Sequence, residues 1–371
     1  MYLAAAYLFA VPPFGTMSLP FVEADGSPRM LTIVHGGGGV GKTTMLHVLA
    51  STRPGHAVVL GSPSPQHEGP PPHAVCEWLL GRDDPERPHA LTITTPNVRL
   101  TGDEQAANLL RKEQGFFDRR ARMSGFVFLA LSSTRWFSRQ PIALHAPLRT
   151  IAHYDVRATA SLDDASRCDL TREVKQALAY ASIGSALVPQ SQRERNQMRA
   201  RIQPDATTAS TPPARSVDMR VLGKAMHEMV DALVRLAGLE YLGIDPASLE
   251  PTFVTRGGRQ LSFDRLPNGA RHLVAFAALP IRTLWAAYPG RDPRECEGVI
   301  AIDEVDLHQD PAVVQELIPT LRRLLPHVQW ILTTTSAALA AGCRTSDILA
   351  LRREPEDETV ELFVGAQART H

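Results

Sequence analysis

Eight consecutive residues near the start of the chain have the composition of a loop that binds phosphate groups. Residues Gly36–Thr43 read G-G-G-G-V-G-K-T and follow the apolar run Leu31–Val34. Glycines let successive main-chain N–H groups turn toward a phosphate, Lys42 can reach the outer phosphates, and the Thr43 hydroxyl can ligate Mg²⁺. A strand, a glycine loop and a helix in this order predict a nucleotide site. The residues expected to contact the nucleotide here are Gly36, Gly37, Gly38, Gly39, Val40, Gly41, Lys42, Thr43 and Thr44.

A pair of carboxylates far downstream supplies the chemistry that this loop lacks. The apolar run Val299–Ile302 predicts a buried strand, and Asp303 and Glu304 follow it directly. At the end of such a strand Asp303 can hold Mg²⁺, while Glu304 can orient or deprotonate the attacking water. Acidic pairs also occur as solvated strand ends, so the prediction depends on the combination with the loop. Together the two motifs predict a site for ATP and Mg²⁺ that hydrolyses ATP.

The distance between the two motifs along the chain narrows the class of nucleotide enzyme. Lys42 and Asp303 are about 260 residues apart, far more than a single crossover connection between parallel strands needs. A large insertion therefore separates the halves of the site, which disfavours small kinases. No Asn-Lys-x-Asp motif for reading guanine occurs in the sequence, which disfavours a GTPase.

The elements that must position these motifs follow from the apolar periodicity. Strands alternating with helices in the last third predict an α/β P-loop NTPase fold, with a mostly parallel sheet flanked by helices. The first 34 residues predict an antiparallel meander, and the insertion before the acid pair is predicted to be largely helical. The predicted strands are 2–10, 19–23, 29–34, 90–94, 299–302 and 328–332, the hairpins are 252–263 and 348–364, and the helices are 103–123, 170–187, 222–236, 270–287 and 313–324.

Three parts are expected along the chain. Residues 1–60 form the first part of an ATPase head with the phosphate loop, 61–220 form an insertion or lid of unassigned role, and 221–371 complete the head. The proline-rich stretch 61–73 predicts an exposed loop, and 204–216 has the composition of a linker.

Composition places few further limits on function. Among 371 residues, 39 are basic and 39 acidic, so no global field draws the chain to nucleic acid. The opening apolar run 1–11 is too short to span a bilayer, and we expect a cytoplasmic protein that does not contact a membrane. Four cysteines with no metal-binding spacing indicate reduced thiols; they are Cys76, Cys168, Cys296 and Cys343.

The run Gly298–Ser336, GVIAIDEVDLHQDPAVVQELIPTLRRLLPHVQWILTTTS, resembles the ABC-class ATPases of the SMC, RecF and OLD kind. It is most similar to their compact bacterial relatives, the group that includes the Septu phage-defence ATPase. Leu266–His272 stands where that family has its signature loop. The resemblance implies that two heads form a head-to-tail homodimer around ATP, with Asn268 and Gly269 facing the partner's nucleotide. Asn268 would cap a helix beginning near Ala270, although Pro-Asn-Gly also fits a simple turn.

Three departures from the family pattern predict slow hydrolysis. Pro267 replaces a serine that would bind the γ-phosphate, and Ala270 replaces a Glu or Gln. Thr335 replaces the family's switch histidine; its hydroxyl can orient a water but cannot carry positive charge. Losing one such donor costs about a hundredfold in rate. His308 and Asp310 stand where the family has a His-x-His pair, and we expect them in a loop at the dimer interface rather than as metal ligands.

Two other readings stay open. The chain could be an ATP-gated switch for a separate effector, such as a nuclease or toxin, with hydrolysis only as a reset, or an AAA+-like ATPase. Because only a short segment follows Thr335, we expect no fused nuclease. DNA repair and phage defence are the expected processes.

Seven arginines could contact the phosphate backbone of DNA. They are weak evidence for DNA binding, because charged runs usually face solvent. These residues are Arg119, Arg120, Arg122, Arg193, Arg195, Arg199 and Arg201.

Overall fold

The computed structural model describes residues 1–53, 72–80, 90–95, 104–123, 125–156, 167–202, 218–354 and 359–369, and within them the side chains of all but 188–202. Of the loop predicted at 61–73, residues 61–71 lie outside these ranges, as does the linker predicted at 204–216. His73, the last residue of that predicted loop, instead begins the strand β4 (His73–Leu79). The chain divides into two compact units. Unit 1 comprises Met1–Arg135, Asp155–Cys168 and Glu297–His371, and unit 2 comprises Trp136–Tyr154 and Asp169–Cys296.

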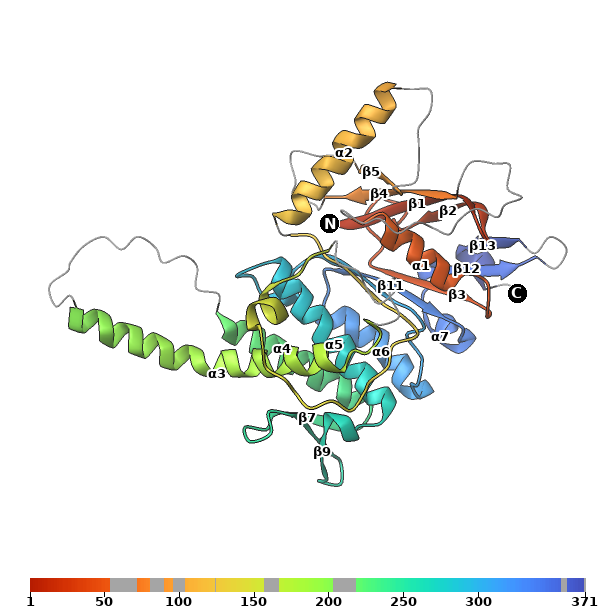
Figure 1. Ribbon diagram of the computed structural model, residues 1–371. Helices are drawn as coiled ribbons and strands as arrows, with labels where there is room; N and C mark the ends of the chain where they lie inside the picture. The colour runs from red at the N-terminus through yellow and green to blue at the C-terminus, as the bar shows by residue number, and fades with distance from the viewer. Residues whose placement is uncertain are drawn as a thin grey trace. The chain divides into compact units, whose positions relative to one another are not determined.

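Unit 1 is built on a six-stranded, mostly parallel sheet, in the order β13-β12-β3-β11-β10-β6. Figure 1 labels β13, β12, β3 and β11 of this sheet. Only the pairing of β12 with β13 is antiparallel. Helices α1 (Lys42–Ser51), α6 (Pro311–Leu324) and α7 (Ala337–Gly342) belong to the same unit. The strands are β3 (Leu31–Gly36), β6 (Phe128–Leu131), β10 (Gly298–Ile302), β11 (Val328–Thr334), β12 (Ile348–Arg353) and β13 (Val360–Val364).

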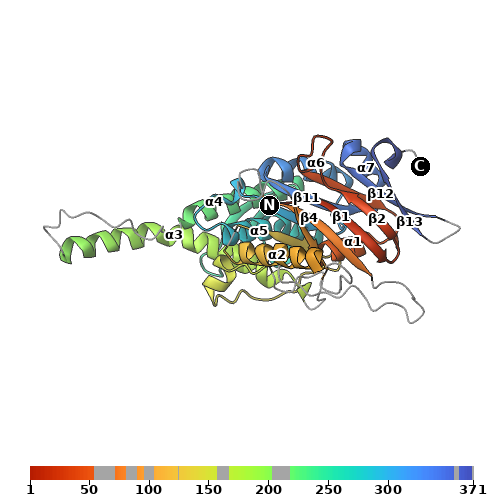
Figure 2. The same cartoon turned by 90° about the horizontal axis from the view of Figure 1, so that it is seen from above.

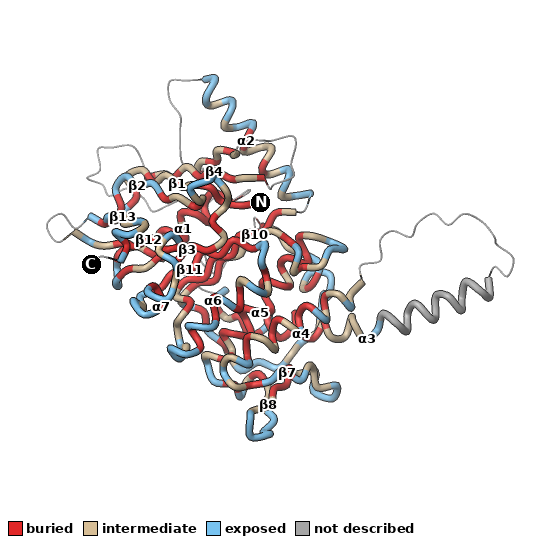
Figure 3. The backbone as a smooth tube through the Cα atoms, turned by 180° about the vertical axis from the view of Figure 1, so that it is seen from behind, coloured by how far each residue is buried: buried red, intermediate tan, exposed pale blue. Residues whose placement is uncertain are grey.

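The central strands of this sheet are buried and mostly apolar because both of their faces are covered. Every residue of β10 and of β11 is buried, and the tube in Figure 3 is red along these strands. Continuous apolar runs of this kind are typical of parallel strands with cover on both sides. The predicted strands at 299–302 and 328–332, the predicted α/β fold and the terminal hairpin are therefore confirmed.

A second, antiparallel sheet of unit 1 has the order β2-β1-β4-β5, and Figure 2 shows β2, β1 and β4 side by side. The N-terminal antiparallel pairing is confirmed for β1 and β2, although β2 lies earlier in the chain than the predicted strand 19–23. The third predicted run of the meander, β3, lies in the parallel sheet. Gln329 of β11 joins the sheets, because its side chain bonds the Leu3 N–H at 2.8 Å and the Leu3 carbonyl at 2.9 Å. The strands are β1 (Tyr2–Val11), β2 (Gly15–Pro20), β4 (His73–Leu79) and β5 (Leu91–Thr94).

The predicted insertion is only partly helical, and the expected boundaries at 60 and 220 do not separate the two units. Helix α2 (Glu104–Arg122) confirms the predicted helix 103–123. However, β4 pairs with β1 and with β5, and β6 pairs with β10, so three strands from the insertion complete the sheets of unit 1. The predicted strand at 90–94 is confirmed as β5. The sequence did not indicate β4 or β6, because β6 has four residues and β4 follows a proline-rich stretch.

Unit 2 is mainly helical. It contains α3 (Thr171–Ile202), α4 (Met219–Leu236), α5 (Asn268–Ala287) and the antiparallel strands β7 (Leu239–Ile244), β8 (Pro251–Thr255) and β9 (Gln260–Ser262). The predicted helices at 222–236 and 270–287 and the hairpin at 252–263 are confirmed. Helices α3 and α4 pack closely at Gly223, where an added Cβ would lie 2.7 Å from the Ser185 Cβ. Short single turns complete the chain: η1 (Leu148–Ala152), η3 (Phe263–Arg265), η4 (Pro293–Glu295), η5 (Thr345–Asp347) and η6 (Gly365–Ala368).

None of the helices within the described ranges is long and apolar enough to cross a membrane. All four cysteines are free thiols, and three of them are buried.

Candidate nucleotide-binding site

The glycine loop connects β3 to α1, so the predicted strand, loop and helix follow one another as expected. Gly41 precedes the first residue of α1 with φ 92°, in the left-handed region that favours glycine. A Cβ at this position would lie 2.6 Å from the Phe14 Cζ atom. Only glycine therefore fits between the loop and the hairpin formed by β1 and β2.

Lys42, the first residue of α1, lies across the loop rather than in solvent. It is 6% exposed, and its Nζ donates to the carbonyls of Gly36 and Gly37, each at 2.8 Å. Burial lowers the pKa of Lys42, while Glu304, Asp303 and, more weakly, Asp306 oppose that shift. The ammonium group thus lies in the field of the carboxylates that follow β10.

Thr43 and Asp303 are in direct contact. The Thr43 hydroxyl donates to Asp303 Oδ2 at 2.8 Å, and the Thr333 hydroxyl donates to Asp303 Oδ1 at 2.6 Å. Asp303 is fully buried, so both of its carboxylate oxygens are oriented by neighbours. The structure therefore brings together two residues that are 260 positions apart in the chain.

Glu304 follows Asp303 but has a different backbone conformation, with φ 45°. Its N–H donates to Thr333 Oγ1 at 2.7 Å. Thr333 therefore contacts both members of the acid pair. Sequence reasoning did not select Thr333, because in the run Thr333-Thr334-Thr335 only the register of β11 distinguishes the three residues.

Strand order explains why these groups meet. In the parallel sheet β11 lies between β3 and β10, and the carboxyl ends of parallel strands share one edge. The loop follows β3, the acid pair follows β10, and Thr335 is exposed just beyond the end of β11. His35, the last residue but one of β3, pairs in register with Thr334.

The donor atoms at this edge fit Mg²⁺. This ion prefers oxygen ligands, keeps several waters and is held by one or two protein groups together with phosphates. Thr43 and Asp303 supply such oxygens. In the described ranges no group of three or more His, Cys, Asp or Glu side chains could hold a metal ion, and the predicted exclusion of His308 and Asp310 as metal ligands stays a prediction. Asp310 precedes α6 and makes no side-chain cap bond.

The signature-like segment belongs to unit 2. The predicted cap is wrong: α5 begins at Asn268 itself, and the preceding residue is Pro267, which makes no side-chain cap bond. The fixed φ of proline suits a position at the start of a helix, and the Pro267 φ is −54°. Asn268 is exposed and Gly269 half-exposed.

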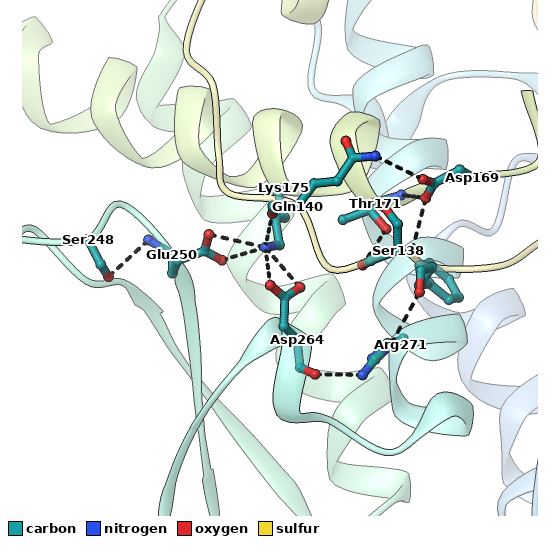
Figure 4. A network of polar contacts seen from close by, with 10 residues as sticks. Ser138, Gln140, Asp169, Thr171, Lys175, Ser248, Glu250, Asp264 and Arg271 are labelled. Carbon is teal, nitrogen blue, oxygen red and sulfur yellow. Dashed lines mark hydrogen bonds and ion pairs between the residues drawn. The ribbon is translucent and has the colours of Figure 1, made fainter.

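A buried polar network holds the chain just before this segment (Figure 4). Lys175 of α3 is 1% exposed, and its Nζ lies 2.9 Å from carboxylate oxygens of both Glu250 and Asp264. It also donates to the Gln140 carbonyl at 2.7 Å. Arg271 of α5 donates to the Asp264 carbonyl at 2.6 Å. The network therefore connects α3, the start of β8 and the turn that leads into α5.

The arginines considered for DNA contact divide into two groups. Arg119, Arg120 and Arg122 are exposed at the end of α2. The side chains of Arg193, Arg195, Arg199 and Arg201 lie outside the described residues.

Known proteins share part of this sequence or this fold, while no protein-family model matches the chain. The chain is 32% identical over 129 residues to the Retron Ec83 probable ATPase of Escherichia coli, a match to 34% of this chain and 23% of that protein. It is 32% identical over 84 residues to the Retron Vc95 probable ATPase of Vibrio cholerae serotype O1 biovar El Tor, over 22% of this chain and 16% of that protein. These alignments therefore span less than a quarter of each relative.

An SMC head solved with the bound C-winged helix domain of ScpA superimposes with a TM-score of 0.50 over 99% of both chains, at 13% identity. This chain has the fold of an SMC head. At that identity the likeness concerns the fold alone. The partial sequence matches are to proteins named probable ATPases.

Proposed function

We propose that this chain is an SMC-like head that binds ATP with Mg²⁺, hydrolyses it slowly and dimerises around it. The observation that carries the proposal is the hydrogen bond between Thr43 and Asp303, because it joins the end of the glycine loop to the acidic strand end. If the glycine loop matched the motif only by chance, nothing would place it against a fully buried carboxylate whose oxygens suit Mg²⁺.

The proposed roles follow from the positions of the side chains. The main-chain N–H groups of the loop and the Lys42 ammonium group would bind the phosphates. The residues from Gly36 to Thr44 would together form the contact with the nucleotide. Thr43 and Asp303 would hold Mg²⁺, whose chemistry is to neutralise charge on the phosphate oxygens. Glu304 would accept a proton from the attacking water, and Thr335 would orient that water at the end of β11. Asn268 and Gly269 would complete the site of a second copy.

A second candidate function is an ATP-gated switch for a separate effector, and one set of observations favours it. Pro267 and Ala270 cannot supply the polar side chains that the family pattern has at these positions, and Thr335 cannot carry positive charge. Both relatives are named for retrons, which fits an ATPase that works within a larger system. We accordingly favour phage defence, with a Septu-like relation and a nuclease or toxin partner, over repair. We also propose that the protein acts in the cytoplasm. DNA is a further candidate partner, with less support than the effector protein.

The test is Glu304→Gln, which removes the base and keeps the size of the side chain. We expect ATP turnover to fall by about a hundredfold or more, while the affinity for ATP is retained. With ATP and Mg²⁺ the variant should elute as a dimer in size-exclusion chromatography. Lys42→Ala, which should lose nucleotide binding, is the control.

Two results would contradict the proposal in different ways. Turnover by Glu304→Gln at the wild-type rate would remove the assigned base. A monomer with bound ATP would remove the dimer and leave the nucleotide site.

A further inference from the structure

A buried arginine, Arg135, contacts the main chain of the acid pair and has no role in the function proposed above. It follows the end of β6 by four positions and is 3% exposed. One of its terminal nitrogens, Nη1, donates to the Asp303 carbonyl at 2.6 Å, and the other, Nη2, donates to the Glu304 carbonyl at 2.8 Å. Nη1 also donates to the Ser132 carbonyl at 2.9 Å. The guanidinium group thus links the segment after β6 to the segment after β10.

The peptide groups of the acid pair are held from two sides. On one side the Asp303 N–H donates to the Leu131 carbonyl of β6 at 2.9 Å, and Arg135 donates to the carbonyls of Asp303 and Glu304. On the other side the Glu304 N–H donates to Thr333 Oγ1 of β11. Hydrogen bonds from an ionised donor are stronger than those between neutral groups, so Arg135 provides the firmer of these restraints.

Such restraint is needed because Glu304 has a positive φ of 45°. A residue with a Cβ adopts this left-handed conformation only where the surrounding structure imposes it. The two carbonyls that Arg135 binds flank the φ and ψ bonds of Glu304. Without the guanidinium group, this peptide could relax and the Glu304 carboxylate would face another direction.

Charge supports the same assignment. Asp303, Glu304 and Asp306 place three carboxylates within four consecutive positions of the sequence. Burial lowers the pKa of Arg135 to about 10, and these three carboxylates oppose that shift. The side chain is therefore cationic at neutral pH, and it adds a fixed positive charge on the β6 side of the acid cluster.

We propose that Arg135 is a positioning residue for Glu304: acting through the main chain of the acid pair, it sets the direction in which the Glu304 carboxylate faces the attacking water. This inference rests on the proposed function, because Glu304 serves as a base only if the chain hydrolyses ATP.

The experiment compares Arg135→Lys with Arg53→Lys. Arg53 is also in unit 1, is 2% exposed, and donates to main-chain carbonyls, those of Val156 at 2.8 Å and Ala50 at 3.4 Å. Both substitutions keep a positive charge and remove the planar fork of donors. The measurements are kcat, the affinity for a non-hydrolysable ATP analogue, and the thermal unfolding midpoint.

We expect both variants to unfold at lower temperature, and only Arg135→Lys to lose kcat, by about 10- to 100-fold. Its affinity for the analogue should stay within about threefold of wild type. If Arg135→Lys does not fold, Arg135→Gln, which keeps one N–H₂ group for the same carbonyls, should show the same selective loss.

Three results would overturn the inference. The first is a kcat in Arg135→Lys equal to that of Arg53→Lys. The second is a joint loss of analogue binding and kcat, which would indicate a structural role. The third is an absence of turnover in the wild type, which would contradict the proposed hydrolysis itself. Because this result is seen without any variant, it separates a failure of the proposed function from a failure of the inference about Arg135.

Discussion

His35, immediately before the glycine loop, has an unusual electrostatic environment for a histidine. Burial lowers its pKa, and the positive charges of Lys42 and Arg352 lower it further. A hydrogen bond with the main chain of Thr335 and the charge of Asp306 act in the opposite direction but do not cancel the shift. The imidazole is therefore neutral at neutral pH, at the edge of the sheet where the phosphates are proposed to bind.

This shift predicts a pH dependence of stability. Because the folded-state pKa lies below the ordinary value of about 6.5, the unfolded chain binds the proton more readily. The stability that His35 contributes is present above that ordinary value and is lost as the pH falls through the folded pKa. In His35→Gln the urea midpoint should therefore fall less than in the wild type between about pH 7.5 and about pH 5.5.

The measurement is urea unfolding of both proteins at the two pH values. Equal m-values would show that the same transition is compared. Equal pH dependence of the two midpoints would contradict the prediction.

At the scale of single residues, the motifs predicted the two groups that the structure brings together, Thr43 and Asp303. They did not predict the residues that orient the acid pair through hydrogen bonds, Thr333 and Arg135. Thr43 and Asp303 could be paired from the sequence because a complete glycine loop and a strand ending in two carboxylates do complementary chemistry. Thr333 and Arg135 could not, because their contacts depend on strand register and on β6, whose pairing with β10 no sequence pattern revealed.

Among the elements, the Lys175 network in Figure 4 has the largest expected effect on the stability of unit 2. Lys175 is almost fully buried, whereas the Glu250 and Asp264 side chains are 18% and 25% exposed. Removing a buried cation leaves its carboxylate partners uncompensated, which costs more than the intact pair contributes.

We therefore predict that Lys175→Met destabilises the protein by about 3 kcal/mol, at the lower end of the usual range because water reaches both carboxylates. Urea unfolding measures the change. The triple variant Lys175→Met, Glu250→Gln, Asp264→Asn should recover part of the loss, because no unpaired charge remains. A Lys175→Met protein as stable as the wild type would show that the network contributes little.

The elements that the sequence predicted well share strong periodicity. The helical stripe of α4, the hairpin of β8 and β9, and the fully apolar β10 each have one dominant pattern. The start of α5 was less predictable, since Pro267, Asn268 and Gly269 all suit a helix start or a turn. Only the tertiary structure selects between the two.

For the whole molecule, the proposed function joins parts of both units. The phosphate loop and the acid pair belong to unit 1, and the signature-like residues Asn268 and Gly269 belong to unit 2. In a symmetric dimer each contact occurs twice. In a head-to-tail sandwich, each nucleotide would therefore lie between the loop of one copy and the signature-like residues of the other.

This arrangement predicts complementation between two inactive variants. Lys42→Ala removes the loop cation, and Gly269→Glu places a negative charge where a partner's phosphates would lie, so each protein alone should be inactive. In an equal mixture half of the dimers are mixed, and each has one site built from two intact halves. With independent sites, the mixture should reach about a quarter of the wild-type ATPase rate per protomer.

The control mixes Lys42→Ala with Glu304→Gln: both changes affect the same half of the site, so this mixture should stay inactive. If the Lys42→Ala and Gly269→Glu mixture is as inactive as its components, although both proteins are folded, the nucleotide is not shared between two copies.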